Sequence, residues 1–431
     1  MNLQPRDLRV HKHLERYLRA PVYQFDLITD PRDPRGQRWP LLSLLWALFY
    51  GMLAGCRTLR QVEDLTDELG PTGRRRVPRR VPDTTLADLI PHLDAEQWRQ
   101  VLHRQVRTLW RGKCLRPVKL PCGVVSIDGK GMGALDHDAD GTAQKAHRAH
   151  DGSCYWLGRT LRAVLTSAVA RTALDQMPIG TKTNEMGMFK PFFSGLMAAY
   201  GGGDLFEIAT VDAGMTSKAN AEVVAAAQKG YVMALKGTQP ELYAEAKRLL
   251  DPLTAGPPCA QTEDRAQGRL IRRSLYRTCE IAGYHDWTHL RQAWLVRQER
   301  IEAGGRVTVE DRYFLTNLHV GRLSGAQSLQ VVRGHWGIEN DCFWSLDAQF
   351  GEDSLPWVTA GRAVEVLGLL RLLAYNLLQL CRKRHLRPRR PRGPEPAPPA
   401  WQQVFRWVWQ ALRLPGAPRV GRISRRETWR V

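Results

Sequence analysis

Four short apolar runs in the middle of the chain constrain its fold more than any other feature. They are GVVSID at 123–128, the run 161–170, LFEIATVD at 205–212 and YVMALK at 231–236. Runs of this length are typical of strands that are buried on both faces of a sheet. The alanine-rich segment 217–229, with Ser217 as its expected N-cap, separates the last two runs. This order of strand, helix and strand predicts a parallel crossover and therefore an α/β fold.

The segment before this core predicts a small helical domain. Residues 40–56 (PLLSLLWALFYGMLAGC) are apolar enough to approach the length of a membrane span, but glycines interrupt the run and Arg57 follows it. We therefore favour a buried helix, followed by a second helix at 59–69. Residues 71–82 (PTGRRRVPRRVP) contain prolines and five arginines and no acid, which predicts an extended basic linker. A solvated loop and an arm along DNA phosphates both remain open for it.

The segments after the core predict three further parts. Residues 269–318 alternate polar and apolar positions, which indicates an antiparallel, β-rich insertion at about 240–318. Long helices are expected at 328–350 and 363–380, then a basic, proline-rich linker and an aromatic helix at 401–414. We accordingly divide the chain into an N-terminal helical domain (1–112), an α/β domain (113–381) and a tail (382–431).

Charge and cysteine usage narrow the class of protein. Lys and Arg number 63 against 43 Asp and Glu, a formal net charge of +20, which favours a polyanionic partner such as nucleic acid. A soluble protein with a basic surface, or a ribosome-associated factor, is the alternative on charge alone. The eight cysteines show no zinc-ligand spacing and are expected to be reduced thiols. The N-terminus lacks the pattern of a secretory signal, so we expect a cytoplasmic protein.

Two aspartates and one glutamate are the candidate chemical groups. Asp128 and Asp212 each end an apolar run, and α/β sheets bind their ligands at the carboxyl ends of strands. Two neighbouring carboxylates repel each other unless a divalent cation joins them, and Mg²⁺ prefers such oxygen ligands. Glu339, on the expected helix 328–350, is the candidate third ligand for a two-metal site of phosphoryl transfer. Each aspartate alone is weak support for a metal site, because an Asp after a strand is more often a turn former than a metal ligand.

Basic residues near these acids are candidate phosphate contacts. Lys236 follows a predicted strand, and Arg333 and His335 precede Glu339. Three arginines of the basic linker are candidates for the DNA backbone: Arg74, Arg75 and Arg76.

The sequence resembles the DDE transposases of bacterial insertion sequences, in the branch that includes the H-repeat-associated proteins. The resemblance covers most of residues 25–380. The matching motifs are Asp30-Pro31-Arg32, Ile127 to Lys130, Lys182-x-Asn184-Glu185, Asp212-Ala213, Leu235-Lys236-Gly237-x-Gln239 and, most specifically, Arg333-x-His335-Trp336-x-Ile338-Glu339-Asn340, followed by Trp344, Asp347, Phe350 and Glu352.

This resemblance implies an RNase H-like fold with a β-rich insertion between the second Asp and the Glu. It implies a transposase that cuts and joins double-stranded DNA at the ends of its element, with Asp128, Asp212 and Glu339 as ligands of two Mg²⁺, for which Mn²⁺ is a plausible substitute. Lys130 and Lys182 lie in its motifs and join the candidate phosphate contacts. Synapsis of two element ends implies a homodimer.

The chain departs from the pattern of similar proteins at two places. Cys342 and Phe343 precede Trp344 where a Leu-His pair is usual, and Gln267 replaces the histidine of a His-Gly-Arg motif. Two alternatives therefore stay open: a degraded copy that binds DNA without cutting it, and a metal-dependent nuclease that does not join strands.

Overall fold

The structure is a computed structural model. It describes residues 12, 16–17, 23–135, 143–148, 152, 154–266, 268–287, 289–354, 357–385 and 397–413. Gln267 lies outside the described residues.

A single mixed sheet forms the centre of the α/β region, in the strand order β2-β3-β1-β5-β6-β10-β9-β8-β7, with β4 paired to β3. Its strands are β1 (Val124–Leu135), β2 (Ala143–Arg148), β3 (Cys154–Leu165), β4 (Thr172–Pro178), β5 (Ile208–Val211), β6 (Gly230–Leu235), β7 (Ala260–Ala266), β8 (Arg269–Thr278), β9 (Gln292–Ile301) and β10 (Val307–Thr316). The mixed α/β class expected from the sequence is confirmed.

The core of this sheet combines both strand directions. The strands β1, β3 and β4 pair antiparallel, whereas β5 pairs parallel with β1 and with β6. Helix α8 (Lys218–Ala226) joins β5 to β6, and the Ser217 hydroxyl caps it by accepting from the Asn220 amide. The predicted parallel crossover and its cap are therefore correct.

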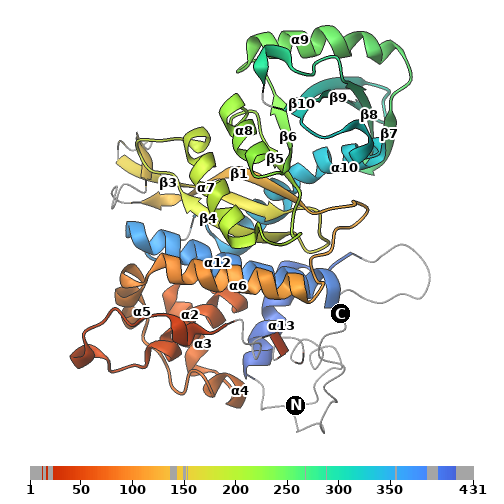
Figure 1. The fold of residues 1–431 in the computed structure, drawn as a ribbon. Helices are drawn as coiled ribbons and strands as arrows, with labels where there is room; N and C mark the ends of the chain where they lie inside the picture. Colours follow the sequence, from red (N-terminus) through yellow and green to blue (C-terminus); the bar gives the residue numbers. More distant parts are fainter. Residues whose placement is uncertain are drawn as a thin grey trace.

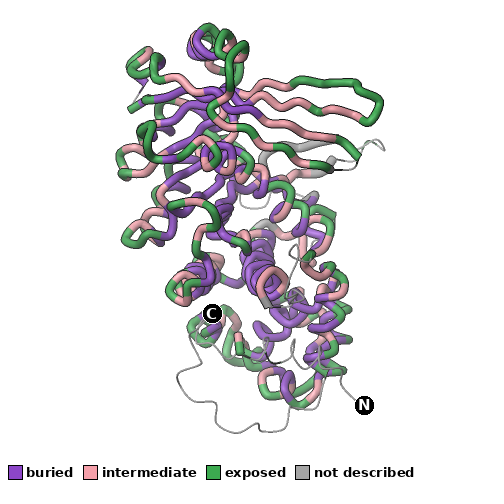
Figure 2. The backbone as a smooth tube through the Cα atoms, turned by 90° about the vertical axis from the view of Figure 1, so that its right-hand side faces the viewer, coloured by how far each residue is buried: buried purple, intermediate pink, exposed green. Residues whose placement is uncertain are grey.

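The predicted β-rich insertion is antiparallel but is not a separate sheet. Strands β7 to β10 pair antiparallel, as their alternating sequence indicated, and β10 also pairs with β6. They therefore extend the central sheet, and helix α9 (Pro240–Leu250) precedes them. The outer ends of these strands are exposed or half-buried, as Figure 2 shows.

Helices cover the sheet and build the N-terminal region. They are α2 (Leu41–Ala54), α3 (Leu59–Asp67), α4 (Pro71–Arg74), α5 (Asp83–Leu89), α6 (Ala95–Arg111), α7 (Glu185–Tyr200), α10 (Gly325–His335), α11 (Trp344–Phe350), α12 (Gly361–Leu380) and α13 (Trp401–Arg413). Figure 1 shows α6 and α12 side by side between the sheet and the smaller helices of the N-terminal region.

Residues 71–82 are not the extended linker that the prolines and arginines predicted. Pro71 begins the short helix α4, and Val77 and Val81 are fully buried in the hydrophobic core of the helical region. The apolar side chains between the arginines therefore hold this segment against the protein.

The terminal helix α13 packs on the N-terminal helical region, so the tail is not an independent part. Its buried residues share one hydrophobic core with α2 and α12, and the Gly70 amide donates to the Leu412 carbonyl at 2.9 Å. Figure 1 shows α13 beside α2 and α4.

Two apolar helices are core helices of this protein. Nearly every residue of α2 is buried by other parts of the chain. Among the described residues, the stretch Arg362–Arg384 is long and apolar enough to cross a membrane, and 94% of its most apolar window is buried inside the protein. A helix that is apolar all round is typical of such burial.

Candidate carboxylate site

Asp128 and Asp212 lie side by side where two parallel strands part. The last paired positions of β1 and β5 are Ile127 and Val211, so the two aspartates are the next residue on each strand. Asp128 does not end its strand as predicted, because β1 continues to Leu135 in antiparallel pairing with β3. Neighbouring strands are about 4.8 Å apart, which brings the two carboxyl groups to one place.

Both aspartates point to the side of the sheet that α10 covers. Two residues earlier, the hydroxyls of Ser126 and Thr210 contact each other at 2.9 Å, and Thr210 Oγ1 also contacts His335 Nδ1 at 2.9 Å. Side chains alternate along a strand, so Asp128 and Asp212 share this face.

Glu339 comes from the helical segment that follows α10. The expected single helix 328–350 is divided here, because residues Ile338–Phe343 form a π-helical turn between α10 and α11. Glu339 is four residues beyond His335, which is about one turn, and neighbours at this spacing lie on the same side of a helix. The side chain of Glu339 is exposed, in contrast to the buried Asp128.

The carboxylates act on one another electrostatically. Burial raises the pKa of the Asp128 carboxyl to about 8, and the negative charges of Asp212 and Glu339 add to this increase. One hydrogen bond, from the Gly129 amide to Asp128 Oδ1 at 2.8 Å, works in the opposite direction. Without a cation, Asp128 therefore holds a proton at neutral pH, and cation binding would displace that proton.

No described Lys, Arg or His forms an ion pair with any of the three predicted acids, and the cations beside them are engaged with other groups. Lys130 contacts Asp347, Arg171 contacts Asp341 and Arg159 contacts Glu185. An uncompensated set of oxygen ligands of this kind suits a hard divalent cation. The fit is not complete in this conformation, because the described residues contain no ready-made group of three or more His, Cys, Asp or Glu that could hold a metal ion.

Glu185 is a fourth acid at this site, and it was not among the residues predicted to act there. It is the first residue of α7, whose N-cap Asn184 accepts from the Gly187 amide. A methyl group on Gly129 would lie 2.0 Å from Glu185 Oε1, so the absence of a side chain at Gly129 admits this carboxylate. Its charge also raises the pKa of Asp128. The Lys182-x-Asn184-Glu185 motif was the sequence signal for it.

Three of the predicted phosphate contacts near the acids are engaged in other interactions. Lys130 is buried, and its ammonium group contacts Asp347 Oδ1 at 2.5 Å and Oδ2 at 2.6 Å. Arg333 pairs with Asp264 at 2.9 Å. His335 is buried, and burial lowers its pKa to about 4, so it is neutral at pH 7 and cannot offer the cation that was predicted.

Lys182 and Lys236 do present free charge. Both side chains are exposed, and neither forms an ion pair with a described residue. Lys182 precedes the N-cap of α7, and Lys236 follows the end of β6. These positions place two ammonium groups on loops that flank the strand ends.

The arginines of residues 71–82 differ in availability. Arg74 donates to the carbonyls of Asp67 and Leu69, and the guanidinium of Arg76 lies 4.3 Å from the centre of the Trp46 ring. Arg75 is exposed. The segment therefore offers DNA much less free charge than an extended arm would.

Comparison with known proteins adds little to this geometry. No family model matches the sequence. The chain is 28% identical over 180 residues to a protein of Xanthobacter autotrophicus described as "Uncharacterized protein in dhlA 3'region". The similarity covers 39% of this chain and 56% of that protein, so the chain spans about half the length of the curated relative that it matches. That description assigns no activity.

Proposed function

We propose that this chain is a DNA transposase that uses Asp128, Asp212 and Glu339 to hold Mg²⁺ for strand cleavage and joining. The observation that carries the proposal is the in-register pair Asp128 and Asp212, with no cation partner, within the electric field of Glu339. The net charge of +20 supports a nucleic-acid substrate.

The sheet is compatible with the RNase H-like core that the resemblance implies. An antiparallel group, β1, β3 and β4, is followed by two parallel strands with a crossover helix. The β7 to β10 extension falls between the second aspartate and the glutamate, where the resemblance expects an insertion.

The central sheet and the helical segment after α10 would each provide metal ligands. The sheet fixes Asp128 and Asp212, whereas Glu339 is exposed and must turn toward them to complete the set of ligands. Bound divalent cations would polarise the scissile phosphate and activate the attacking oxygen. Lys182 and Lys236 would neutralise the flanking phosphates as the substrate approaches.

The test is strand cleavage and joining with a plasmid that carries the gene and its flanking DNA. Asp128→Asn, Asp212→Asn and Glu339→Gln should each lower the Mg²⁺-dependent rate by about 100-fold or more, because a metal ligand stabilises transition-state charge by several kcal/mol. Each variant should still bind DNA. The matched control is Glu222→Gln, an exposed acid on α8, which should leave the rate unchanged.

The products separate the alternatives. Cleavage without covalent insertion into a second plasmid would identify a nuclease. Binding without any Mg²⁺-dependent or Mn²⁺-dependent product would identify a DNA-binding remnant. A normal cleavage rate for Asp128→Asn would remove the carboxylate assignment.

A further inference from the structure

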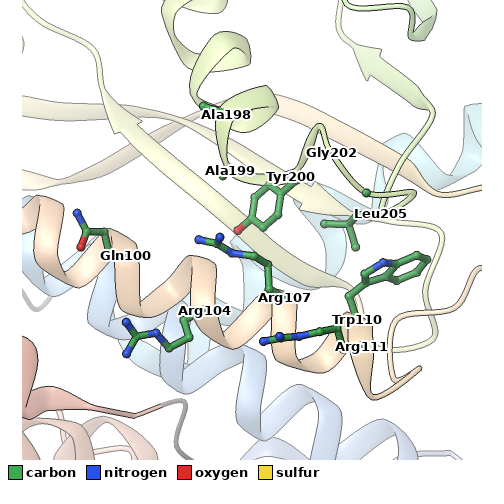
Figure 3. Close-up of a pocket in the computed structure, with 11 residues that line it drawn as sticks. Gln100, Arg104, Arg107, Trp110, Arg111, Ala198, Ala199, Tyr200, Gly202 and Leu205 are labelled. Carbon is green, nitrogen blue, oxygen red and sulfur yellow. The ribbon is translucent and has the colours of Figure 1, made fainter.

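Away from the carboxylates, three arginines that form no ion pair with a described residue line a cleft between α6 and the end of α7. Figure 3 shows this cleft, with Arg107 on α6 pointing toward Tyr200 and with Arg104 and Arg111 on the same helix to either side of Arg107. Its volume is about 700 Å³, and none of its lining residues is acidic. The rim is open, because a methyl group on Gly202 would meet no atom within 4 Å.

The arginines form one stripe on α6. Together with Gln100 they follow the spacing of four, three and four residues that aligns side chains along one side of a helix. The opposite side of α6 provides the packing, since it buries Trp98, Leu102 and other apolar residues. The stripe is therefore not needed to attach this helix to the core.

None of these three guanidinium groups has an acidic partner among the described residues. Arg104 donates to Gln24 Oε1 at 2.5 Å, Arg107 reaches only the His103 carbonyl of its own helix at 3.4 Å, and none of the three forms an ion pair with a described residue. By contrast, Arg248 and Arg300 pair with Glu245 and Glu310. The cleft thus keeps its charge available for an anion from outside.

We propose that this cleft binds the phosphate backbone of duplex DNA at a distance from the carboxylates. Arg104 to Arg111 span about 10 Å along the helix axis, over which one DNA strand carries about three phosphates. A row of guanidinium groups suits successive phosphates better than one small anion, and the half-buried ring of Trp110 gives the deoxyribose an apolar surface to pack on.

Helix α7 sets the distance between the two sites. Its first residue, Glu185, lies at the carboxylates and its last, Tyr200, lines the cleft, so the rise along the helix separates them by about 22 Å. This length corresponds to about seven base pairs of duplex. The inference rests on the proposed function, because it takes the DNA in the cleft to be the DNA that is cut.

The test is binding of a labelled duplex to the full chain, followed by fluorescence anisotropy over a series of salt concentrations without divalent cations. The triple variant Arg104→Ala, Arg107→Ala, Arg111→Ala should bind more weakly. The slope of log Kd against log salt should fall by about 0.9 for each lost phosphate contact, or about 2.7 for three. The control triple, Arg248→Ala, Arg269→Ala, Arg300→Ala, removes equal charge from exposed, acid-paired arginines and should keep the wild-type slope.

The outcomes distinguish this inference from the proposed function. If the wild-type chain binds and cleaves DNA but the triple variant keeps the wild-type salt slope, the proposed DNA site in the cleft is wrong and the proposed function stands. The same conclusion follows if the chain binds duplex RNA of the same sequence more tightly than duplex DNA. Absence of DNA binding by the wild-type chain overturns both. If the triple variant melts early, Arg111→Glu at the exposed end of α6 provides the same measurement, with an expected loss of slope of about one.

Discussion

At the scale of single residues, the site depends on acids that the fold brings close together, of which Asp128, Asp212 and Glu339 have no cationic partner among the described residues. Asp128 is buried beside Asp212, and Glu185 reaches it from α7 only because Gly129 has no side chain. Such repulsion is costly to a folded protein and is tolerated where a cation or a reaction requires it.

Gly129→Ala should disable the site without unfolding the protein. Its new methyl group would lie 2.0 Å from Glu185 Oε1, so the Glu185 carboxylate must turn away from Asp128. We expect the rate of Mg²⁺-dependent cleavage to fall at least about tenfold, because small displacements of groups at an active site lower the reaction rate strongly.

The control for that change lies on the same strand. A methyl group on Gly131 would meet only Leu157 Cδ2 at 4.0 Å, an ordinary contact, so Gly131→Ala should cleave at the wild-type rate. Equal rates for the two alanine variants would show that the position of Glu185 does not matter.

At the scale of elements, the link between β5 and α10 positions Glu339. Thr210 Oγ1 contacts His335 Nδ1 at 2.9 Å in a buried environment, and the helical backbone continues from His335 through Trp336 and Gly337 to Glu339. The π-helical turn then allows the Trp344 amide to donate to the Glu339 carbonyl. Single π-helical turns of this kind are frequent at functional sites.

Thr210→Val should loosen this link. The variant leaves the His335 Nδ1 atom buried without its partner, which costs about 1–3 kcal/mol in the free energy of unfolding, measured by denaturant titration. Cleavage should fall as well, because Glu339 depends on the position of α10. Thr308→Val, an exposed threonine on β10, is the control and should change stability by less than about 0.5 kcal/mol.

At the scale of the whole molecule, the two ends of the chain build one helical region. The ring of Phe405 on α13 lies against Gly55, where a methyl group would approach its Cδ2 atom to 2.7 Å, and it also packs on Phe350 with ring centres 5.4 Å apart. Gly55 ends α2 at a φ of +74°, a conformation that glycine adopts without strain. The turn at the end of α2 therefore packs directly against an aromatic ring of α13, although about 350 residues separate the two along the chain.

Phe405→Ala should destabilise the entire protein and not just its tail. Loss of this buried ring is expected to lower the free energy of unfolding by about 3–5 kcal/mol, measured by chemical denaturation with a fluorescence readout. Its neighbour Arg406 is exposed, so Arg406→Ala should remain within about 0.5 kcal/mol of wild type. If Phe405→Ala unfolded only α13 and left the main unfolding transition of the protein unchanged, this prediction would be wrong.

Helix α6 connects the helical region to the sheet. Arg99 on α6 pairs with Asp175 of β4 at 3.1 Å and with Glu365 of α12 at 2.6 Å, and His103 contacts Asp175 at 2.8 Å. These largely buried contacts join the helical region to the α/β region, and breaking a buried ion pair is strongly destabilising.

The sequence by itself located the central strands and several helices, but it did not locate α6, α7 or β4. Apolar runs without alternation located the central strands, alternation located β8 to β10, and the hydroxyl of Ser217 located the start of α8. It also pointed to Asp128 and Asp212, because polar residues that follow buried strands meet at one edge of a parallel pair. Periodicity and capping are local properties, so they can be read without knowing the partners.

Only the tertiary structure decided which polar groups are available. Strand β1 continues past Asp128 because β3 supplies hydrogen bonds there, and His335 is neutral because β5 and α10 enclose it. Arg74 and Arg76 fold onto the protein because Val77 and Val81 are drawn into the core, while the charge stays free on α6. A charge is free or paired according to groups that are distant along the chain, and burial sets its energy, so no local pattern could reveal it.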